Sequence, residues 1–322
     1  MKTLICLTML LLAHVTWAQE TPIATGGMHQ HSPTGDELEV WVDQPALQNA
    51  PSNIMVRDAT GLVTQITNGG MNTQPSTSGD LIAWTCRGPS DNYPQICRCI
   101  YGAGSCPVVV VTNRLADASK LHGPARVHLS RIVYPENSPG QTPTVVLFDV
   151  ATSNRDTFGT GIYPDLDALR GVIAFLRQVS GGYQLRVVAM SGATLRVYAL
   201  PGFPSWGRPI IDRQGDLIVL PREDANLWVY GIFATSSTSI PLSGTQSQAV
   251  IRAGTLLWND NPDFDSEVRG CRLPVCIPVV VADNPDLHDV APTFAGENIL
   301  FTRMNTPLEG DIIQVPLPPS LQ

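Results

Sequence analysis

The stretch SGDLIAWTC, residues 78–86, decides the fold of this chain. It opens with a Gly-Asp turn and continues into a short apolar strand that carries Trp84 near its end. The same outline returns as GTLLWND at residues 254–260 and as GENILFTR at residues 296–303. One outline that recurs at distant positions indicates an internal repeat.

A large apolar or aromatic residue ends this strand in each of seven units. These marker residues are Trp41, Trp84, Tyr134, Phe175, Leu220, Trp258 and Phe301. They follow one another at intervals of 43, 50, 41, 45, 38 and 43 residues, a period that suits four-stranded propeller blades. The sequence therefore predicts an all-β, seven-bladed β-propeller of antiparallel blades. Six or eight blades remain alternatives, because the third to fifth units match the outline less closely.

The order of sequence features inside each unit also supports the repeat. In five units a proline lies nine to eleven residues before the marker: Pro75, Pro124, Pro164, Pro209 and Pro292. A glycine-centred turn often follows, and then the apolar strand, a polar hairpin and one or two further β-branched strands. No stretch shows a sustained period of 3.6 residues, so we expect few helices.

The two ends of the chain predict how the ring closes. The last unit has no fourth strand of its own, whereas the segment ETPIATG precedes the first full unit. A ring that failed to close would leave unpaired strand edges. We therefore expect residues near Thr21 to Thr25 to supply the outer strand of the seventh blade, and the alternative is a frayed terminus.

The unit of proline, turn, apolar strand, polar loop and strand resembles the TolB-like or PD40 class of WD40-related propellers. The resemblance is clearest at QPSTSGDLIAWTC, residues 74–86, and at APTFAGENILFTR, residues 291–303. The Trp-Asp and Gly-His pairs of true WD40 repeats are missing. The resemblance implies a propeller over the whole mature chain that works as a binding module.

The first eighteen residues have the layout of a cleavable secretory signal. Lys2 precedes an apolar run, and small residues at Thr16 and Ala18 favour cleavage after Ala18. The alternative of a membrane anchor is disfavoured, because the run from Leu4 to Val15 is too short to span a bilayer. We expect an exported protein, periplasmic or secreted, whose residues 19–322 form a single propeller domain.

Charge limits the partners of the chain. Its 20 basic and 28 acidic residues give a formal net charge of -8, and the sequence contains no basic cluster. Nucleic acids and anionic membrane surfaces both require a Lys/Arg surface. We therefore expect no nucleic-acid partner, no insertion into a membrane, and a monomer.

Six cysteines remain after the signal, an even number that favours disulfides in an exported chain. CIYGAGSC and CRLPVC occupy the same place in the second and sixth units, before PVVVVTN and PVVVADN. This correspondence pairs Cys99 with Cys106 and Cys271 with Cys276, each across the turn between third and fourth strands. Cys86 and Cys97 then join the preceding hairpin. A zinc site at Cys97, Cys99 and Cys106 is the alternative, although paired C-x2-C knuckles are absent.

Two clusters of candidate metal ligands are visible. His29 and His31, with Met28 beside them, are ligand types that copper favours, but a solvated linker is the favoured interpretation and the copper site is the alternative. The second cluster lies in one hairpin loop and consists of Asp260, Asp263, Asp265 and Glu267. Calcium prefers several such oxygens, whereas an ordinary acidic turn is the alternative. We expect no cofactor, and calcium is the alternative.

One group could act in acid–base catalysis. The stretch ADNPDLHDV contains Asp283, Asp286, His288 and Asp289, and a histidine flanked by carboxylates can serve as a general base. No G-x-S-x-G elbow and no phosphate-binding loop accompanies it. Our leading hypothesis is thus a non-catalytic binding module for a protein or an envelope component. The rival is a carbohydrate hydrolase or lyase at the channel mouth, where paired carboxylates could cleave a glycosidic bond.

Overall fold

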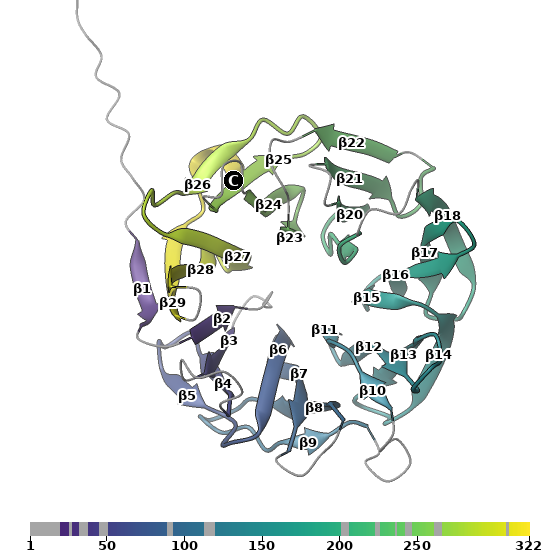
Figure 1. Cartoon of the computed structure of the whole chain (residues 1–322), viewed down its shortest axis with the longest axis horizontal. Helices are drawn as coiled ribbons and strands as arrows, with labels where there is room; N and C mark the ends of the chain where they lie inside the picture. The colour runs from purple at the N-terminus through teal and green to yellow at the C-terminus, as the bar shows by residue number, and fades with distance from the viewer. Residues whose placement is uncertain are drawn as a thin grey trace, which may run out of the picture.

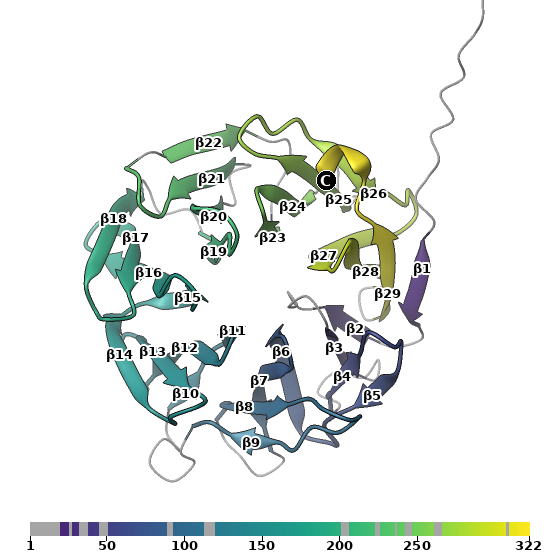
Figure 2. The same cartoon turned by 180° about the vertical axis from the view of Figure 1, so that it is seen from behind.

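The computed structural model is a ring of β-sheets around a central channel (Figure 1), and the view from behind shows the same closed ring (Figure 2). The structure describes residues 20–25, 28–31, 38–44, 51–88, 93–112, 120–200, 206–222, 226–235, 237–241, 247–260, 266–306 and 309–322. Among these residues the only helical element is the 3-10 turn η1, Pro319–Leu321. No helix in this part of the chain is long and apolar enough to cross a membrane.

Seven antiparallel blades make up the ring, which confirms the predicted fold. Blade 1 contains β2 (Met28–His31), β3 (Glu39–Gln44), β4 (Asn53–Arg57) and β5 (Val63–Gln65). Blade 2 contains β6 (Met71–Ser78), β7 (Leu81–Arg87), β8 (Gln95–Ile100) and β9 (Val109–Val110). Blade 3 contains β10 (Leu121–His122), β11 (Arg126–His128), β12 (Arg131–Asn137), β13 (Thr144–Asp149) and β14 (Arg155–Thr160).

The remaining blades follow in chain order. Blade 4 contains β15 (Ile162–Asp167), β16 (Val172–Val179), β17 (Gly182–Ala189) and β18 (Thr194–Leu200). Blade 5 contains β19 (Ile210–Ile211), β20 (Leu217–Arg222), β21 (Asn226–Gly231) and β22 (Ser237–Pro241). Blade 6 contains β23 (Ser247–Arg252), β24 (Thr255–Asp260), β25 (Glu267–Arg272) and β26 (Val279–Ala282). Blade 7 contains β27 (His288–Ala295), β28 (Asn298–Thr306), β29 (Glu309–Pro316) and β1 (Thr21–Ala24).

The marker residues form the contacts between neighbouring blades. Each lies in the second strand of its blade and is at most 2% exposed. Each also belongs to a different hydrophobic cluster, and every cluster combines residues of two adjacent blades. Trp84 of β7, for example, packs with Val40 of β3 and Ile54 of β4. The sequence period therefore arises because every interface between blades needs one large buried side chain.

Three of the five recurrent prolines mark bulges in the innermost strands. The pairing of β6 with β7 shifts between Thr73 and Ser76, and Gln74, just before Pro75, has a φ of 53°. The same shift and a positive φ precede Pro164 in β15 and Pro292 in β27. Proline donates no backbone hydrogen bond, so it is tolerated where the ladder is interrupted.

The N-terminal strand completes the seventh blade, which confirms the predicted closure. β1 pairs antiparallel with β29, with Thr21 opposite Gln314 and Pro22 opposite Ile313. Directly before β1, Glu20 accepts a hydrogen bond from Arg303 of β28 at 2.9 Å. The first and last strands of the chain therefore lie side by side (Figure 1).

The turns between first and second strands link successive blades. Ser78 of blade 2 accepts the amide of Leu129 in blade 3 at 3.0 Å, and His128 Nδ1 accepts the amide of Ala168 in blade 4 at 2.9 Å. Asp212 of blade 5 accepts the amide of Gly254 in blade 6 at 2.7 Å. Each of these hydrogen bonds involves the equivalent turn of its blade. Together they connect neighbouring blades at one end of the channel.

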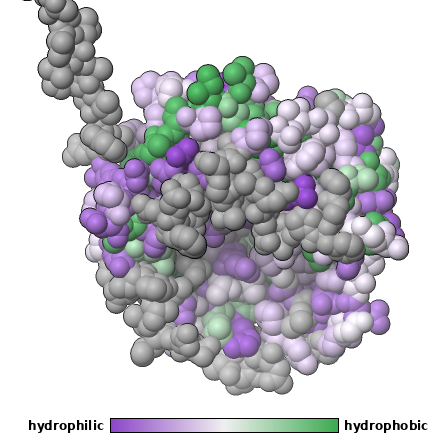
Figure 3. Space-filling view, turned by 45° about the horizontal axis from the view of Figure 1, so that its top comes forward, coloured by the Kyte–Doolittle hydropathy of each residue, from purple (hydrophilic) through white to green (hydrophobic). Residues whose placement is uncertain are grey.

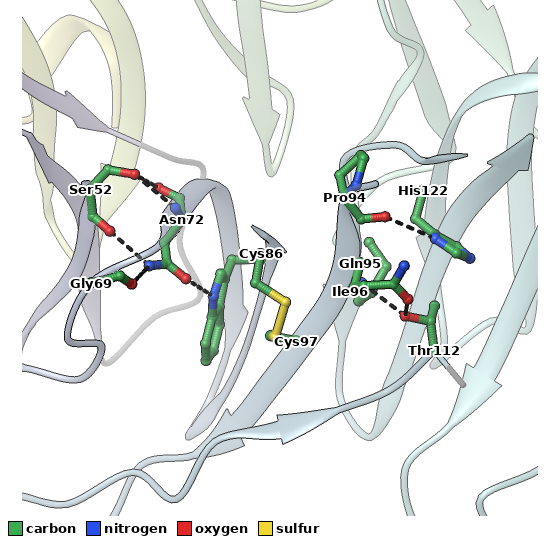
Figure 4. Close-up of a disulfide and its surroundings, with 11 residues drawn as sticks. Ser52, Gly69, Asn72, Cys86, Pro94, Gln95, Ile96, Cys97, Thr112 and His122 are labelled. Carbon is green, nitrogen blue, oxygen red and sulfur yellow. Dashed lines mark hydrogen bonds between the residues drawn. A yellow bond between two sulfur atoms is a disulfide. The ribbon is translucent and has the colours of Figure 1, made fainter. Parts of the chain in front are cut away.

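Three disulfides confirm the predicted pairing. Cys99–Cys106 and Cys271–Cys276 each span the turn between third and fourth strands, and Cys86–Cys97 joins β7 to β8. Figure 4 shows the Cys86–Cys97 bond near Asn72, whose amide donates to the carbonyls of Ser52 and Gly69. All six cysteines are thus in disulfides, and they do not form the alternative zinc site. Three disulfides are typical of an oxidising compartment.

Candidate functional site

A cavity of about 270 Å³ lies in the central channel. The innermost strands of blades 2 to 7 line it, and its polar and charged lining includes Ser76, Arg126, His128, Asp165, Arg213 and Arg252. Figure 3 shows hydrophilic residues in the hollow at the centre of the ring. Because six blades contribute to one cavity, this is where side chains distant in the sequence meet.

The inner-strand bulges determine which residues face the cavity. Ser76, Asp165 and Thr293 each follow directly after one of the recurrent prolines, and all three line the cavity. Val250 follows the corresponding bulge of β23 and lines it as well. Bulges commonly re-aim side chains next to functional sites, and here they direct one residue per strand inward.

Three arginines and one aspartate form a charged cluster at one side of this cavity. Arg126 begins β11, Asp165 lies in β15, and Arg208 and Arg213 flank β19. They therefore come from blades 3, 4 and 5, whose inner strands are neighbours in the ring. Three guanidinium groups against one carboxylate give the cluster an excess of positive charge, although the whole chain has a net charge of -8.

Two hydrogen bonds fix the centre of this cluster. The Oδ2 atom of Asp165 accepts the backbone amide of Ile211 at 2.8 Å, and Asp165 is only 4% exposed. Arg213 reaches across the channel and donates to the carbonyl of Val127 at 2.7 Å. The first bond ties blade 4 to blade 5, and the second ties blade 5 to blade 3.

Arg126 and Arg208 have no such partner. Among the residues that the structure describes, neither guanidinium forms a hydrogen bond or an ion pair. Burial lowers the pKa of Arg126, and the charge of Arg208 lowers it further, against the attraction of Asp165. Burial likewise lowers the pKa of Arg208, again opposed by Asp165. Both side chains stay half-buried because the channel is open to water.

A second charged group lies next to His128. Asp167 is fully buried, and its Oδ1 accepts the amides of Leu169 and Arg170 at 3.0 and 3.2 Å. Arg170 also bonds the other carboxylate oxygen of Asp167 and the carbonyls of Asp212 and Gly215. Burial opposes ionisation, but the close contact with His128 and the hydrogen bonds from Arg170 lower the pKa of Asp167 below its usual range. This group joins blades 4 and 5.

A neighbouring cavity of about 450 Å³ opens on the C-terminal segment. It shares Arg252, Phe294 and Gln214 with the channel cavity. The Arg252 guanidinium lies 4.5 Å from the centroid of the Phe294 ring, a cation–π distance. The channel and this second cavity thus meet at Arg252.

The structure describes only two of the four residues of the predicted calcium site. Asp263 and Asp265 lie outside the described residues, whereas Asp260 and Glu267 stand opposite each other on β24 and β25. Arg269 pairs with both carboxylates, at 3.2 Å from Asp260 and 2.5 Å from Glu267. No group of three potential ligands occurs among the described residues. The calcium site stays a prediction.

The predicted acid–base group is spread over the surface. Asp283, Asp286 and His288 are exposed, whereas Asp289 is fully buried. Arg303 donates to both oxygens of Asp289, at 2.7 and 2.8 Å, and also bonds Glu20. Asp289 therefore belongs to an ion pair in the closing blade, and the His288 imidazole accepts the Ser266 amide at 3.3 Å.

The histidine pair lies in a strand, not in the linker that the sequence favoured. Met28, His29 and His31 belong to β2, in which His29 stands opposite Asp43 and His31 opposite Trp41 of β3. β2 also pairs with β29 through Met28 and Gly310. The linker interpretation was wrong because this segment supplies the inner strand of blade 1.

Sequence reasoning missed the arginine cluster entirely. The sequence contains no basic cluster, but the fold builds one from positions 126, 208 and 213. A usable signal was present, since Arg208 directly precedes Pro209, Asp165 directly follows Pro164, and Arg126 lies two residues after Pro124. Charged residues beside the recurrent prolines are those that the inner strands present to the channel.

Comparison with known proteins supports the fold. No family model and no curated protein matches the sequence. The β-propeller domain of the Trilobed protease from Pyrococcus furiosus is similar with a TM-score of 0.66 and 13% identity, over 89% of this chain and 95% of that one. That domain has an open velcro topology, whereas β1 closes blade 7 here.

Two enzymes have similar structures as well. An oligogalacturonate lyase from Vibrio parahaemolyticus matches with a TM-score of 0.65 and 11% identity, over 96% of both chains. A puromycin-hydrolyzing peptidase from Mycobacterium tuberculosis matches with a TM-score of 0.66 and 12% identity, over 91% of this chain and 52% of that one. This chain therefore spans about half the length of the peptidase. At these identities the comparisons support the fold alone, a β-propeller, and the seven blades come from the strand pairing of this chain.

Proposed function

We propose that this chain is an exported, non-catalytic binding module of the TolB-like or PD40 class, and that it recognises a protein or an envelope component through its channel. The observation that carries the proposal is the charged channel cavity, which six blades line and side-chain contacts hold rigid. Propellers carry their functions on loops and channel residues of an otherwise rigid ring. The three disulfides favour export.

Affinity capture tests the proposed partner. The mature protein is immobilised, and envelope and secreted fractions of its host are passed over it. We expect one stoichiometric component to be retained, and to be lost when Arg126 and Arg213 are both changed to glutamate. The control changes Arg186 and Arg196 to glutamate on β17 and β18, away from the channel. Equal retention by both double variants would rule out the channel as the binding site.

Two further measurements test the remaining parts of the proposal. N-terminal sequencing of the exported protein should begin at Gln19, because residues 1–18 form the proposed signal peptide. Light scattering of the purified protein should give the mass of a monomer. If residues 1–18 are retained, the proposal that they are a cleaved signal peptide is wrong.

A carbohydrate-active enzyme is the second candidate, and the match to an oligogalacturonate lyase over 96% of both chains favours it. Its site would lie at the channel mouth, where arginines could bind acidic sugars. Incubation with polygalacturonate distinguishes the candidates. Shortening of the polymer, or ultraviolet absorbance from new unsaturated ends, would establish an enzyme, whereas an unchanged polymer supports the binding module.

A further inference from the structure

The channel cavity has a charge imbalance that the fold itself does not correct. Asp165 is the acidic residue of the cluster, and it is already bound to the Ile211 amide. Arg208 and Arg213 both repel Arg126, because the positive charge of each lowers the pKa of Arg126. Like charges held together in a half-buried site are unfavourable unless an opposite charge joins them.

The three arginines differ in how many of their N–H donors are already in hydrogen bonds. Arg213 uses one nitrogen on the Val127 carbonyl. Arg126 and Arg208 use none on any residue that the structure describes. A guanidinium presents five N–H donors in a planar fork that matches the two oxygens of a carboxylate or phosphate. The cluster therefore has unused donors as well as unbalanced charge.

The cavity limits the size of what can enter. Its volume of about 270 Å³ lies at the lower end of small-molecule sites. Arg126 and Arg213 line it directly, and Arg208 lies two residues before Ile210, which also lines it. A single acidic group or a small organic acid has the size and the charge that this cavity requires.

We propose that Arg126, Arg208 and Arg213 form an oxyanion site inside the channel, which binds a carboxylate or phosphate group of the ligand. This inference deepens the proposed function and rests on the use of the channel for recognition. Asp165 and the Ile211 amide hold the site together, and the Arg126 and Arg208 forks contact the anion. The residues beside the recurrent prolines are then ligand-binding residues.

Thermal shift and titration calorimetry with two probes test the proposal on the mature protein. Citrate supplies carboxylates and inorganic phosphate supplies phosphate, and sodium chloride at equal ionic strength controls for screening. We expect saturable binding of at least one probe with a rise in Tm that chloride does not reproduce. Citrate alone would identify carboxylate as the group, and phosphate alone would identify phosphate.

Variants assign the binding to the cluster. Arg126→Gln and Arg208→Gln should each weaken binding of the probe about tenfold or more. Both should keep or raise the Tm measured without probe, because each removes a repelling charge. Arg186→Gln, on the third strand of blade 4, is the matched control and should bind normally. If a glutamine variant does not fold, the lysine variant replaces it, since lysine keeps the charge and loses the planar fork.

Two results overturn the site: no binding beyond chloride, or equal affinity in wild type, Arg126→Gln and Arg208→Gln. Failure of the site is distinguishable from failure of the proposed function. If the protein binds citrate but retains no component of the envelope, the oxyanion site is supported and the proposed partner is contradicted. A chain that retains its partner but binds neither probe keeps the function and loses the oxyanion site.

Discussion

The Asp212 carboxylate accepts the backbone amide of Gly254 at 2.7 Å, and so ties the inner turn of blade 5 to that of blade 6. The same carboxylate accepts the amides of Ala253 at 2.9 Å and Gln214 at 3.1 Å. Asp212 is fully buried, so removing its side chain leaves three amides without their acceptor.

We therefore predict that Asp212→Ala lowers the free energy of unfolding by about 2–5 kcal/mol, since three hydrogen bonds to a buried carboxylate are lost. Chemical denaturation measures the change. Asp216→Ala is the control, because the Asp216 side chain is 69% exposed and its ion pair with Arg170 lies at the surface. It should change stability by less than about 1 kcal/mol. Similar losses in the two variants would contradict a special role for Asp212.

The marker residues should be the most sensitive core positions. Phe175 is fully buried between blades 3 and 4. Phe175→Ala should cost about 3–5 kcal/mol, because it leaves a cavity that the rigid sheets cannot fill. Leu169→Ala, at a residue that is 76% exposed, should change stability by less than about 0.5 kcal/mol. Tolerance of alanine at Phe175 would show that the interface can repack.

The closing strand should matter most for blade 7. Deletion of residues 20–25 removes β1 and the Glu20 partner of Arg303. We expect Tm to fall by roughly 5–10 °C. Hydrogen exchange of β29 should become faster, while that of β17 in blade 4 stays the same. Unchanged protection of β29 would mean that β1 adds little to the closed ring.

Acid should destabilise the link between blades 4 and 5. The close contact with His128 and the hydrogen bonds from Arg170 lower the pKa of Asp167 in the folded protein. An ordinary aspartate titrates near pH 3.9, so folding favours the ionised form and Asp167 stabilises the protein above about pH 4. This stabilisation is lost as pH falls further, toward the lowered pKa.

Tm measured as a function of pH checks this prediction. Asp167→Asn should lower Tm at neutral pH and flatten its decrease below about pH 4. The exposed Asp156→Asn serves as the control and should follow the wild-type profile. A decrease as steep in Asp167→Asn as in wild type would assign the acid sensitivity to other carboxylates.

The blade architecture was predictable because it depends on local rules that repeat. A large buried residue such as Trp84 recurs in every unit, a proline such as Pro75 recurs in five units, and a cysteine loop recurs in two. The closing strand followed from counting strands at both ends. The disulfides followed from aligning one unit with another, since Cys99–Cys106 and Cys271–Cys276 occupy equivalent turns.

The channel site was not predictable in the same way. Arg126 and Arg213 lie 87 positions apart, and only the ring brings Arg213 to the Val127 carbonyl. His29 and His31 read as a polar linker because a short inner strand has no apolar pattern of its own. Conversely, Asp289 read as a catalytic candidate because its partner Arg303 lies on another strand. Local sequence patterns predict the blades, whereas the surroundings of a charged residue depend on contacts between residues far apart in the sequence.

The proline bulges affect how a ligand in the channel can bind to the inner strands. In blades 2 to 7 each inner strand pairs on one side only, so its other edge faces the channel. In β6, β15 and β27 a proline removes one donor from that strand, and the residue before it leaves extended geometry. A peptide therefore finds no regular edge on which to dock as an extra strand. Specificity in the channel must come from side chains, and can change by single substitutions that leave every blade intact.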